Sequence, residues 1–258
     1  MNSEDILKQP PPPADARLSY GTDPNQFGEI RVPKSKGPFP LLMNIHGGFW
    51  RAKYDLAHAG HLCAALTAKG LATWNIEYRR VGNPGGGWPG TFEDIRSAFR
   101  YTAQIPKRYN IDASKVLVMG HSAGGELALC LAAHEPSLKC VVSLAGVVDL
   151  QQALELHLSD DAVVGFLGGK PTDVREHYHE ADPMQISVPH STTQWLIHGA
   201  KDTVVPSYFS RSYAQEKKSR GENVHYLEIS TAGHYELIDP GSAAWPKVEN
   251  TVLHELGR

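Results

Sequence analysis

The strongest constraint on the fold is a regular alternation of short apolar runs with longer amphipathic stretches after residue 40. Runs of this length that are almost wholly apolar are typical of strands covered on both faces of a parallel sheet. The alternation therefore predicts an α/β fold, with a mostly parallel, twisted sheet and helices on both faces. The apolar runs cover residues 40–45, 71–78, 115–120, 140–146, 193–199 and 224–229, and the amphipathic stretches cover 55–69, 92–104, 122–133, 207–219 and 243–256.

Three segments depart from this alternation. Residues 17–32 are expected to form an antiparallel hairpin at the sheet edge, which brings the expected total to about eight strands. Residues 1–16 include four consecutive prolines at 10–13, which cannot join a helix or a central strand, so we expect a flexible extended arm. Residues 150–190 lack a clear strand, and so long an interruption is typical of a functional lid or insert. The remaining chain, 17–258, is expected to be one domain.

Composition excludes several classes of partner. The 258 residues contain 25 Lys and Arg against 28 Asp and Glu, so a net charge of −3 leaves no basic excess for binding nucleic acid. No apolar run approaches the roughly 18 residues that a membrane span needs, so no membrane association is expected. Cys63, Cys130 and Cys140 are an odd number at wide spacing, and no signal-peptide pattern precedes them. These features predict a cytoplasmic protein without a disulfide framework, and they leave a homodimer open.

The motif with the clearest chemistry is Gly120-His121-Ser122-Ala123-Gly124, which follows an apolar run and opens a helix-like stretch. A serine between glycines in a strand–turn–helix context is typical of a nucleophile held on a sharp, strained turn. The glycines are needed because the two arms of the turn approach closely. We therefore predict Ser122 as the nucleophile of a covalent mechanism.

A second glycine-rich turn follows the apolar run 40–45. Its sequence is HGGFW at residues 46–50, and glycines in such a turn leave backbone N–H groups open to a substrate. An attacking serine creates an oxyanion that needs such donors. We predict the N–H groups of Gly48, Phe49 and Ala123 as these donors, and we interpret His46 as structural.

A serine nucleophile needs a base, and the base needs an acid to orient it. His234 follows the apolar run 224–229 and a glycine, and Asp202 follows the run 193–199. Both lie in loops after expected strands, so we predict His234 as the base and Asp202 as its orienter, with Asp149 as the rival acid. Other histidines are expected to lie in strands, helices or turns that do not suit this role: His121, His198, His225 and His254.

Metal and cofactor sites are not expected. Two histidine pairs have spacings that could suggest metal ligands, but no carboxylate or cysteine set completes either of them. These pairs are His58 with His61 and His177 with His179.

The residues around the predicted nucleophile suggest a pocket. Trp50 and Trp88 are large aromatic residues close to glycine-rich turns, and His121 adjoins the serine. We predict that these residues line a substrate pocket, and we leave open that both tryptophans instead pack their loops against the body. Three charged residues after the run 71–78 are interpreted as structural ion pairs: Glu77, Arg79 and Arg80.

Taken together, these motifs resemble the α/β-hydrolase superfamily, with a closer likeness to small esterases of the hormone-sensitive-lipase type and to kynurenine formamidase-like hydrolases. The resemblance covers roughly residues 17–256 and rests on HGGFW, EYRR, WPGTFEDI, GHSAGGELA, GVVDL, HGAKDTVVP and GHYEL. It implies the α/β-hydrolase fold and a Ser-His-Asp mechanism. One departure is Phe49, the fourth residue of this turn, where the hormone-sensitive-lipase pattern HGGG has a glycine. The aromatic version is more similar to the formamidase group.

The function expected from these features is hydrolysis of small carboxylic esters through an acyl-enzyme intermediate, without a cofactor. Two alternatives stay open. The first is an aryl formamidase or amidase of the kynurenine formamidase type, and the second is a non-catalytic ligand-binding protein on a hydrolase scaffold.

Overall fold

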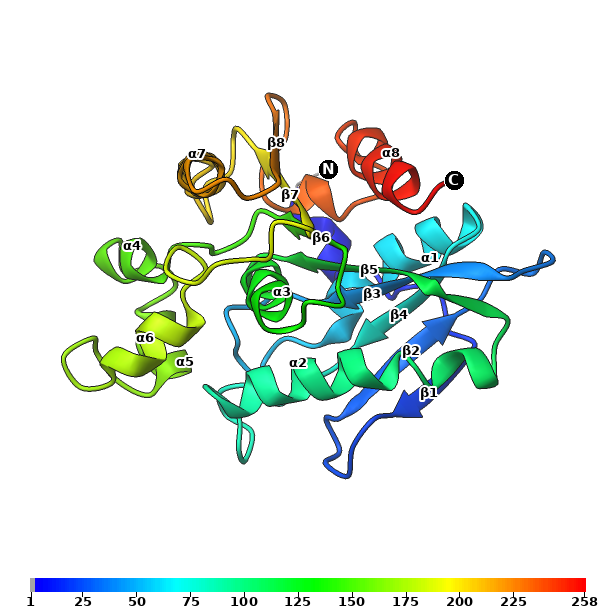
Figure 1. Cartoon of the computed structure of the whole chain (residues 1–258), viewed down its shortest axis with the longest axis horizontal. Helices are drawn as coiled ribbons and strands as arrows, with labels where there is room; N and C mark the ends of the chain where they lie inside the picture. Colours follow the sequence, from blue (N-terminus) through cyan, green and yellow to red (C-terminus); the bar gives the residue numbers. More distant parts are fainter. Residues whose placement is uncertain (1–2) are drawn as a thin grey trace.

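The computed structural model describes residues 3–258 and contains one eight-stranded sheet (Figure 1). The strand order is β1-β2-β4-β3-β5-β6-β7-β8, and the six strands from β4 to β8 in this order run parallel to one another. The first two strands form an antiparallel hairpin at one edge. The strands are β1 (Ala16–Ser19), β2 (Phe27–Arg31), β3 (Phe39–Ile45), β4 (Ala72–Ile76), β5 (Ile111–His121), β6 (Cys140–Leu144), β7 (Thr193–Gly199) and β8 (Val224–Ile229).

Helices cover both faces of this sheet, as predicted (Figure 1). The α-helices are α1 (Gly60–Ala68), α2 (Gly90–Tyr101), α3 (Ala123–His134), α4 (Leu150–Glu155), α5 (Ala162–Leu167), α6 (Arg175–Ala181), α7 (Tyr208–Ser219) and α8 (Trp245–Glu255). Four short 3-10 helices accompany them: η1 (Ser3–Lys8), η2 (Leu56–Ala59), η3 (Ile105–Lys107) and η4 (Tyr235–Leu237).

Two buried clusters form the core, one on each face of the sheet. Neighbouring residues of one strand divide between the clusters because successive side chains of a strand point to opposite faces. Leu41 and Met43 pack with α2, α3 and α7, whereas Leu42 packs with α1 and α8. This division explains why the central strands are apolar at nearly every position.

The expected flexible arm differs from the structure. Residues 3–8 form η1, and Ile6 is buried in the core cluster with α1 and α8. The proline-rich part that follows forms neither helix nor strand, and the Arg31 guanidinium donates to the Pro12 carbonyl at 2.7 Å. The apolar pair at 6–7 supplies burial that the proline-based prediction overlooked. Residues 1 and 2 lie outside the described part.

The segment predicted as a lid or insert lies between β6 and β7 and holds α4, α5 and α6. These helices form the left end of the molecule in Figure 1, beyond α3. Residues 156–159, which lie between α4 and α5, line the Ser122 pocket described below.

One strand ends earlier than its apolar run predicts. β4 stops at Ile76, although the run continues to residue 78. Beyond the strand end, the buried Glu77 carboxylate accepts from the N–H groups of Tyr78 and Leu56, at 3.0 and 3.1 Å.

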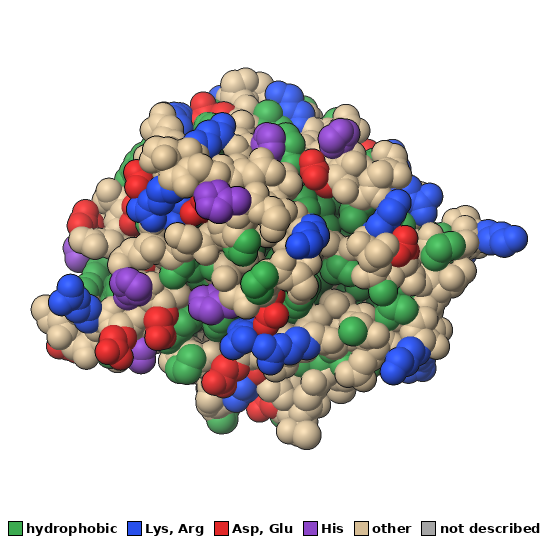
Figure 2. Space-filling view, viewed as in Figure 1, with side chains coloured by type: hydrophobic (Ala, Val, Ile, Leu, Met, Phe, Trp, Pro, Cys, Tyr) green, Lys and Arg blue, Asp and Glu red, His purple; other side chains and the backbone are tan. Residues whose placement is uncertain are grey.

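The surface carries both signs of charge. Figure 2 shows acidic and basic side chains interspersed over the viewed face, in agreement with the small net charge of −3. Among the helices of residues 3–258, each is too short or too polar to cross a bilayer.

Candidate active site

Ser122 lies on a sharp turn between β5 and α3. Its backbone has φ +57° and ψ −122°, a conformation that costs a non-glycine residue about 1–3 kcal/mol. The turn is held because the Ser122 N–H donates to the Leu144 carbonyl at 2.8 Å and its carbonyl accepts from the Gly125 N–H at 2.9 Å. The serine thus opens α3 in the strained geometry that the G-x-S-x-G motif predicts.

The glycines around this turn are required by close packing. A Cβ at Gly120 would lie 1.9 Å from the Gly124 carbonyl oxygen, and one at Gly124 would lie 2.2 Å from the Ile45 carbonyl oxygen. In the loop after β3, a Cβ at Gly47 would lie 3.0 Å from the Ser122 Cβ. The absent side chains therefore let the loop 46–50 approach the serine.

Asp202 and His234 are joined directly. Asp202 follows β7, His234 follows β8, and the His234 Nδ1 lies 2.6 Å from the Asp202 Oδ2. Both side chains are buried, with the His234 side chain 4% exposed. Because an ionised carboxylate only accepts, the His234 Nδ1 carries the proton, and in the neutral ring Nε2 is left as a bare acceptor.

The surroundings of Asp202 keep it ionised. Burial alone would raise the pKa of this carboxyl, but hydrogen bonds from His198 and His234 outweigh it and hold the pKa below its usual range. The N–H groups of Val204 and Val205 also donate to Oδ1, each at 2.8 Å. His198, which the sequence suggested was a simple core residue, lies with Nε2 3.3 Å from the Asp202 Oδ2.

The loop 46–50 has an unusual backbone. Gly48, Phe49 and Trp50 all have positive φ, at 115°, 49° and 56°. Within residues 3–258, the N–H groups of Gly48, Phe49 and Ala123 donate to no protein acceptor. These are the three donors that the sequence predicts for an oxyanion, and Gly48 and Phe49 line the same pocket as Ser122.

A buried ion cluster supports this loop from behind. Glu77 Oε1 lies 3.0 Å from the His46 Nε2 and 2.9 Å from the Arg80 Nη1. The Tyr78 hydroxyl donates to the His46 carbonyl at 2.8 Å. Arg79 instead pairs with Asp94 at 2.6 Å. These residues therefore stabilise the scaffold and do not line the pocket.

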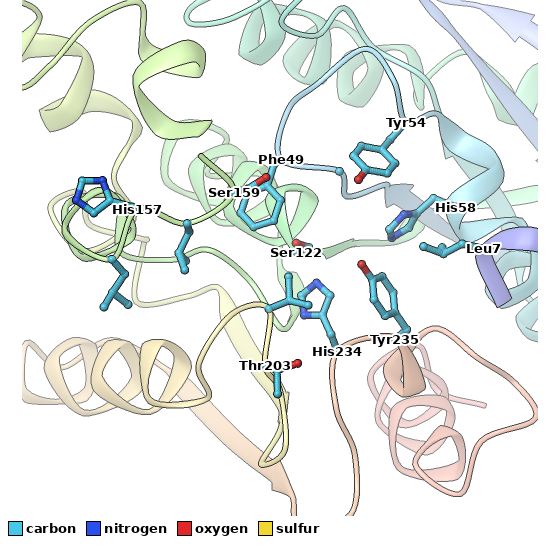
Figure 3. Close-up of a pocket in the computed structure, with 14 residues that line it drawn as sticks. Leu7, Phe49, Tyr54, His58, Ser122, His157, Ser159, Thr203, His234 and Tyr235 are labelled. Carbon is cyan, nitrogen blue, oxygen red and sulfur yellow. The ribbon is translucent and has the colours of Figure 1, made fainter. Parts of the chain in front are cut away.

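Ser122 and His234 share one pocket with a volume of 380 Å³ (Figure 3). Figure 3 shows the Ser122 hydroxyl and the His234 ring near the middle of this pocket, between two walls. In Figure 3, Leu7, Tyr54, His58 and Tyr235 lie on one side of these two residues, and His157 and Ser159 lie on the other. The lining also includes Leu156, Leu158, Thr203 and Val204. The sequence indicated none of these residues, because distant segments bring them together.

The three pocket residues predicted from the sequence do not line this pocket. Trp50 is fully buried and stacks on Phe166, with ring centroids 4.5 Å apart. Trp88 stacks on Phe92 at 5.0 Å. His121 is buried, and its Nε2 lies 3.0 Å from the His234 carbonyl oxygen. For the two tryptophans, packing against the body is the alternative that the sequence left open, and the positive φ of Trp50 directs its side chain into the core.

The rival residues lie elsewhere. Asp149 caps α4, where its Oδ1 accepts from the Gln152 N–H at 2.8 Å. His225 stacks on Trp195, and His177 Nδ1 lies 2.7 Å from the Leu167 carbonyl oxygen. Within the described residues, no group of three or more His, Cys, Asp or Glu side chains is arranged to hold a metal ion.

The sheet order, the strained serine turn and the post-strand acid and histidine define an α/β-hydrolase. Comparison with known families then places the chain. The BD-FAE family model matches residues 29–216, and the chain belongs to this family.

Curated relatives are esterases by name. Esterase LipC of Mycobacterium tuberculosis is 26% identical over 254 residues, which cover 86% of this chain and 60% of the relative. A probable isoprenylcysteine alpha-carbonyl methylesterase of Arabidopsis thaliana, ICMEL1, is 29% identical over 86% of this chain and 51% of its own length. The chain therefore spans about half to three fifths of these relatives.

Solved structures share the fold. A truncated carbohydrate esterase from gut microbiota has a TM-score of 0.82 at 19% identity and covers 97% of this chain and 100% of its own. Est2, an esterase of Thermogutta terrifontis, has a TM-score of 0.77 at 20% identity, and the match covers 98% of this chain and 97% of Est2. At this identity the likeness concerns the fold alone.

Proposed function

We propose that this protein is a serine hydrolase that cleaves small carboxylic esters through an acyl-enzyme intermediate. The observation that carries the proposal is the 2.6 Å contact between His234 Nδ1 and Asp202 Oδ2 beside a strained serine in the same pocket. Ser122, Asp202 and His234 follow the carboxyl ends of β5, β7 and β8, and we infer that they act together there.

The proton transfers follow from the tautomer of His234. Its bare Nε2 takes the proton of the Ser122 hydroxyl as the oxygen attacks the ester carbonyl. The imidazolium is stabilised by the ionised Asp202, and it then protonates the leaving alcohol. A water molecule repeats both steps on the acyl-enzyme and regenerates Ser122.

The oxyanion is stabilised by backbone donors. The N–H groups of Gly48, Phe49 and Ala123 have no acceptor among the described residues, and the strained loop 46–50 holds two of them against the pocket. Donors fixed in place before the reaction need no reorganisation when the charge develops. This role explains why the loop has three successive residues with positive φ.

The pocket suits a small acyl group. A cavity of 380 Å³ is near the lower end of the range for small-molecule sites. Among the described residues that line it, none is Lys, Arg, Asp or Glu, which favours an uncharged substrate. The esterase names of the curated relatives support the same substrate class.

Kinetics of p-nitrophenyl ester hydrolysis test the proposal. We expect the wild-type chain to hydrolyse the acetate and Ser122→Ala to lose about 10⁶-fold in kcat with the fold intact. His234→Ala should lose a similar amount. Near-normal turnover in either variant would contradict the assignment, and circular dichroism controls for folding.

An aryl formamidase is the second candidate, because Phe49, Tyr54 and Tyr235 place three aromatic rings around the pocket. N-formylkynurenine and p-nitrophenyl esters of two to twelve carbons, assayed side by side, separate the two activities. A fluorophosphonate probe addresses the non-catalytic alternative, since a binding protein would leave Ser122 unlabelled.

A further inference from the structure

Trp50 is the residue that anchors the strained loop 46–50. It follows two residues with positive φ, and its own φ is 56°. Such a backbone persists only where the surroundings hold it. The Trp50 side chain is fully buried, so its contacts are the means by which the loop keeps its shape.

Two contacts hold the indole ring from different elements. The Nε1 atom donates to the Glu126 Oε2 at 2.9 Å, and the ring stacks on Phe166 with an interplanar angle of 5°. Glu126 lies in the first turn of α3, next to the serine turn, and Phe166 lies in α5 of the insert. Trp50 therefore links the loop, the α3 helix and the insert.

The second oxygen of Glu126 extends this link through Cys130. The Cys130 Sγ lies 3.1 Å from the Glu126 Oε1 and 3.0 Å from the Ala181 carbonyl oxygen at the end of α6. A thiol has one proton and cannot donate to both acceptors. If Glu126 is protonated, its Oε1–H donates to the sulfur and the thiol donates to Ala181, so every atom is paired.

The electrostatics agree with a neutral Glu126. The side chain is fully buried, and burial raises the pKa of its carboxyl to about 8. The titratable groups that face it are Cys130 on its own helix, Asp182 after α6 and Tyr78 after β4. None of these supplies a positive charge that would favour the ionised form.

We propose that Glu126, in its neutral form, is a positioning residue that holds the loop 46–50 through Trp50 and the insert through Cys130. The inference rests on the proposed function, because it assigns the loop to oxyanion binding. As pH rises and Glu126 ionises, Oε1 turns from donor to acceptor. Cys130 then donates to Glu126 and releases Ala181, which loosens the insert beside the pocket.

The test compares Glu126→Gln with Glu126→Leu, using Glu222→Gln and Glu222→Leu as matched controls. Glutamine reproduces the neutral pattern, with an oxygen for Trp50 and an NH₂ for Cys130. Glu222 is also buried, but it accepts from Gln194 at 2.9 Å near the start of β8. The number of active sites in each preparation comes from complete fluorophosphonate labelling.

We expect Glu126→Leu to lower kcat per labelled site by about 10–100-fold with little change in KM, as a displaced catalytic loop would. We expect the kcat of the wild type to decline above about pH 8, where Glu126 ionises. Glu126→Gln should keep the wild-type kcat at lower pH and should not show this decline. The Glu222 variants should keep both the wild-type kcat and the decline.

A wild-type kcat in Glu126→Leu, or an alkaline decline that survives in Glu126→Gln, would overturn the inference while leaving the proposed function intact. If Glu126→Leu does not fold, the pH profile of Glu126→Gln decides. If the wild type neither hydrolyses esters nor reacts with the probe, the proposed function fails instead. The NMR signal of the Trp50 indole N–H then tests the contact: a shift near pH 8 that is absent in Glu126→Gln supports it, and no shift overturns it.

Discussion

Asp202 and Glu126 are both buried carboxyl groups close to the pocket, yet their surroundings favour opposite charge states. Asp202 receives donors from His198, His234 and two backbone N–H groups, and its pKa is lowered despite burial. Glu126 has one firm donor, the indole of Trp50, and its pKa is raised to about 8. The number of donors, more than the depth of burial, thus decides whether a buried acid keeps its charge.

Of the changes at these two acids and their neighbours, the largest expected effect comes from removing the charge of Asp202. Asp202→Asn should lower kcat for p-nitrophenyl acetate by about 10⁴-fold, because the amide no longer selects the His234 tautomer with a bare Nε2. Steady-state kinetics on samples with verified folding measure the loss. A loss of less than tenfold would mean that Asp202 does not orient the base.

A smaller loss is expected when Asp202 keeps its charge but loses one donor. His198→Ala removes the ring nitrogen that lies 3.3 Å from the Asp202 Oδ2. A hydrogen bond to a charged group contributes about 1.5–3 kcal/mol, so kcat should fall by about 10–100-fold. The pKa of Asp202 should also rise, because one of its donors is lost. As pH is lowered, the variant should therefore lose activity at a higher pH than the wild type does. Identical pH profiles would contradict this role for His198.

Stability should respond to the two acids in opposite directions. The pKa of Asp202 is lower in the folded than in the unfolded chain. Asp202 therefore stabilises the fold at pH values above its unfolded pKa, and this stabilisation is lost as pH falls through its folded pKa. The raised pKa of Glu126 gives stability that is present below its unfolded value and lost as pH rises toward about 8. Between pH 5 and 8, the free energy of unfolding of the wild type should therefore fall by up to about 1.4 kcal/mol per pH unit because of Glu126, and Glu126→Gln should remove this fall.

Urea unfolding at several pH values, with Glu222→Gln as the control, measures this difference. Equal slopes in the wild type and Glu126→Gln would show that Glu126 is already ionised across the range.

The smallest effect is expected at Trp88. Its ring stacks on Phe92 outside the pocket, and its Nε1 has no hydrogen-bond partner within residues 3–258, so Trp88→Phe removes packing but no hydrogen bond seen there. We expect the ester KM and kcat to stay close to wild type and the unfolding free energy to fall by about 1 kcal/mol. A large rise in KM would contradict this prediction and indicate that the Trp88 ring contacts the substrate.

The sequence alone predicted the sheet and its helices because buried parallel strands are apolar at nearly every position. It also indicated Ser122, Asp202 and His234, because the loops after parallel strands meet at one edge of the sheet. The contact between Asp202 and His234 needed the structure, and so did the role of His198, whose strand position suggested only core packing.

The pocket walls could not be predicted in the same way. Leu7 reaches the site from the N-terminal segment and His58 from η2, and no local pattern connects either of them with Ser122. Trp50 was expected in the pocket because of its place in the sequence. The left-handed backbone of residues 48–50 instead leaves Phe49 at the pocket and turns Trp50 into the core.

The central claim is that Ser122, His234 and Asp202 act as one unit, and the rate of fluorophosphonate labelling tests it most directly. Intact-mass measurements should show one adduct on the wild-type chain, peptide mapping should place it on Ser122, and Asp202→Asn should react at least a hundredfold more slowly. An adduct on another residue, or equal rates in the two proteins, would contradict the account.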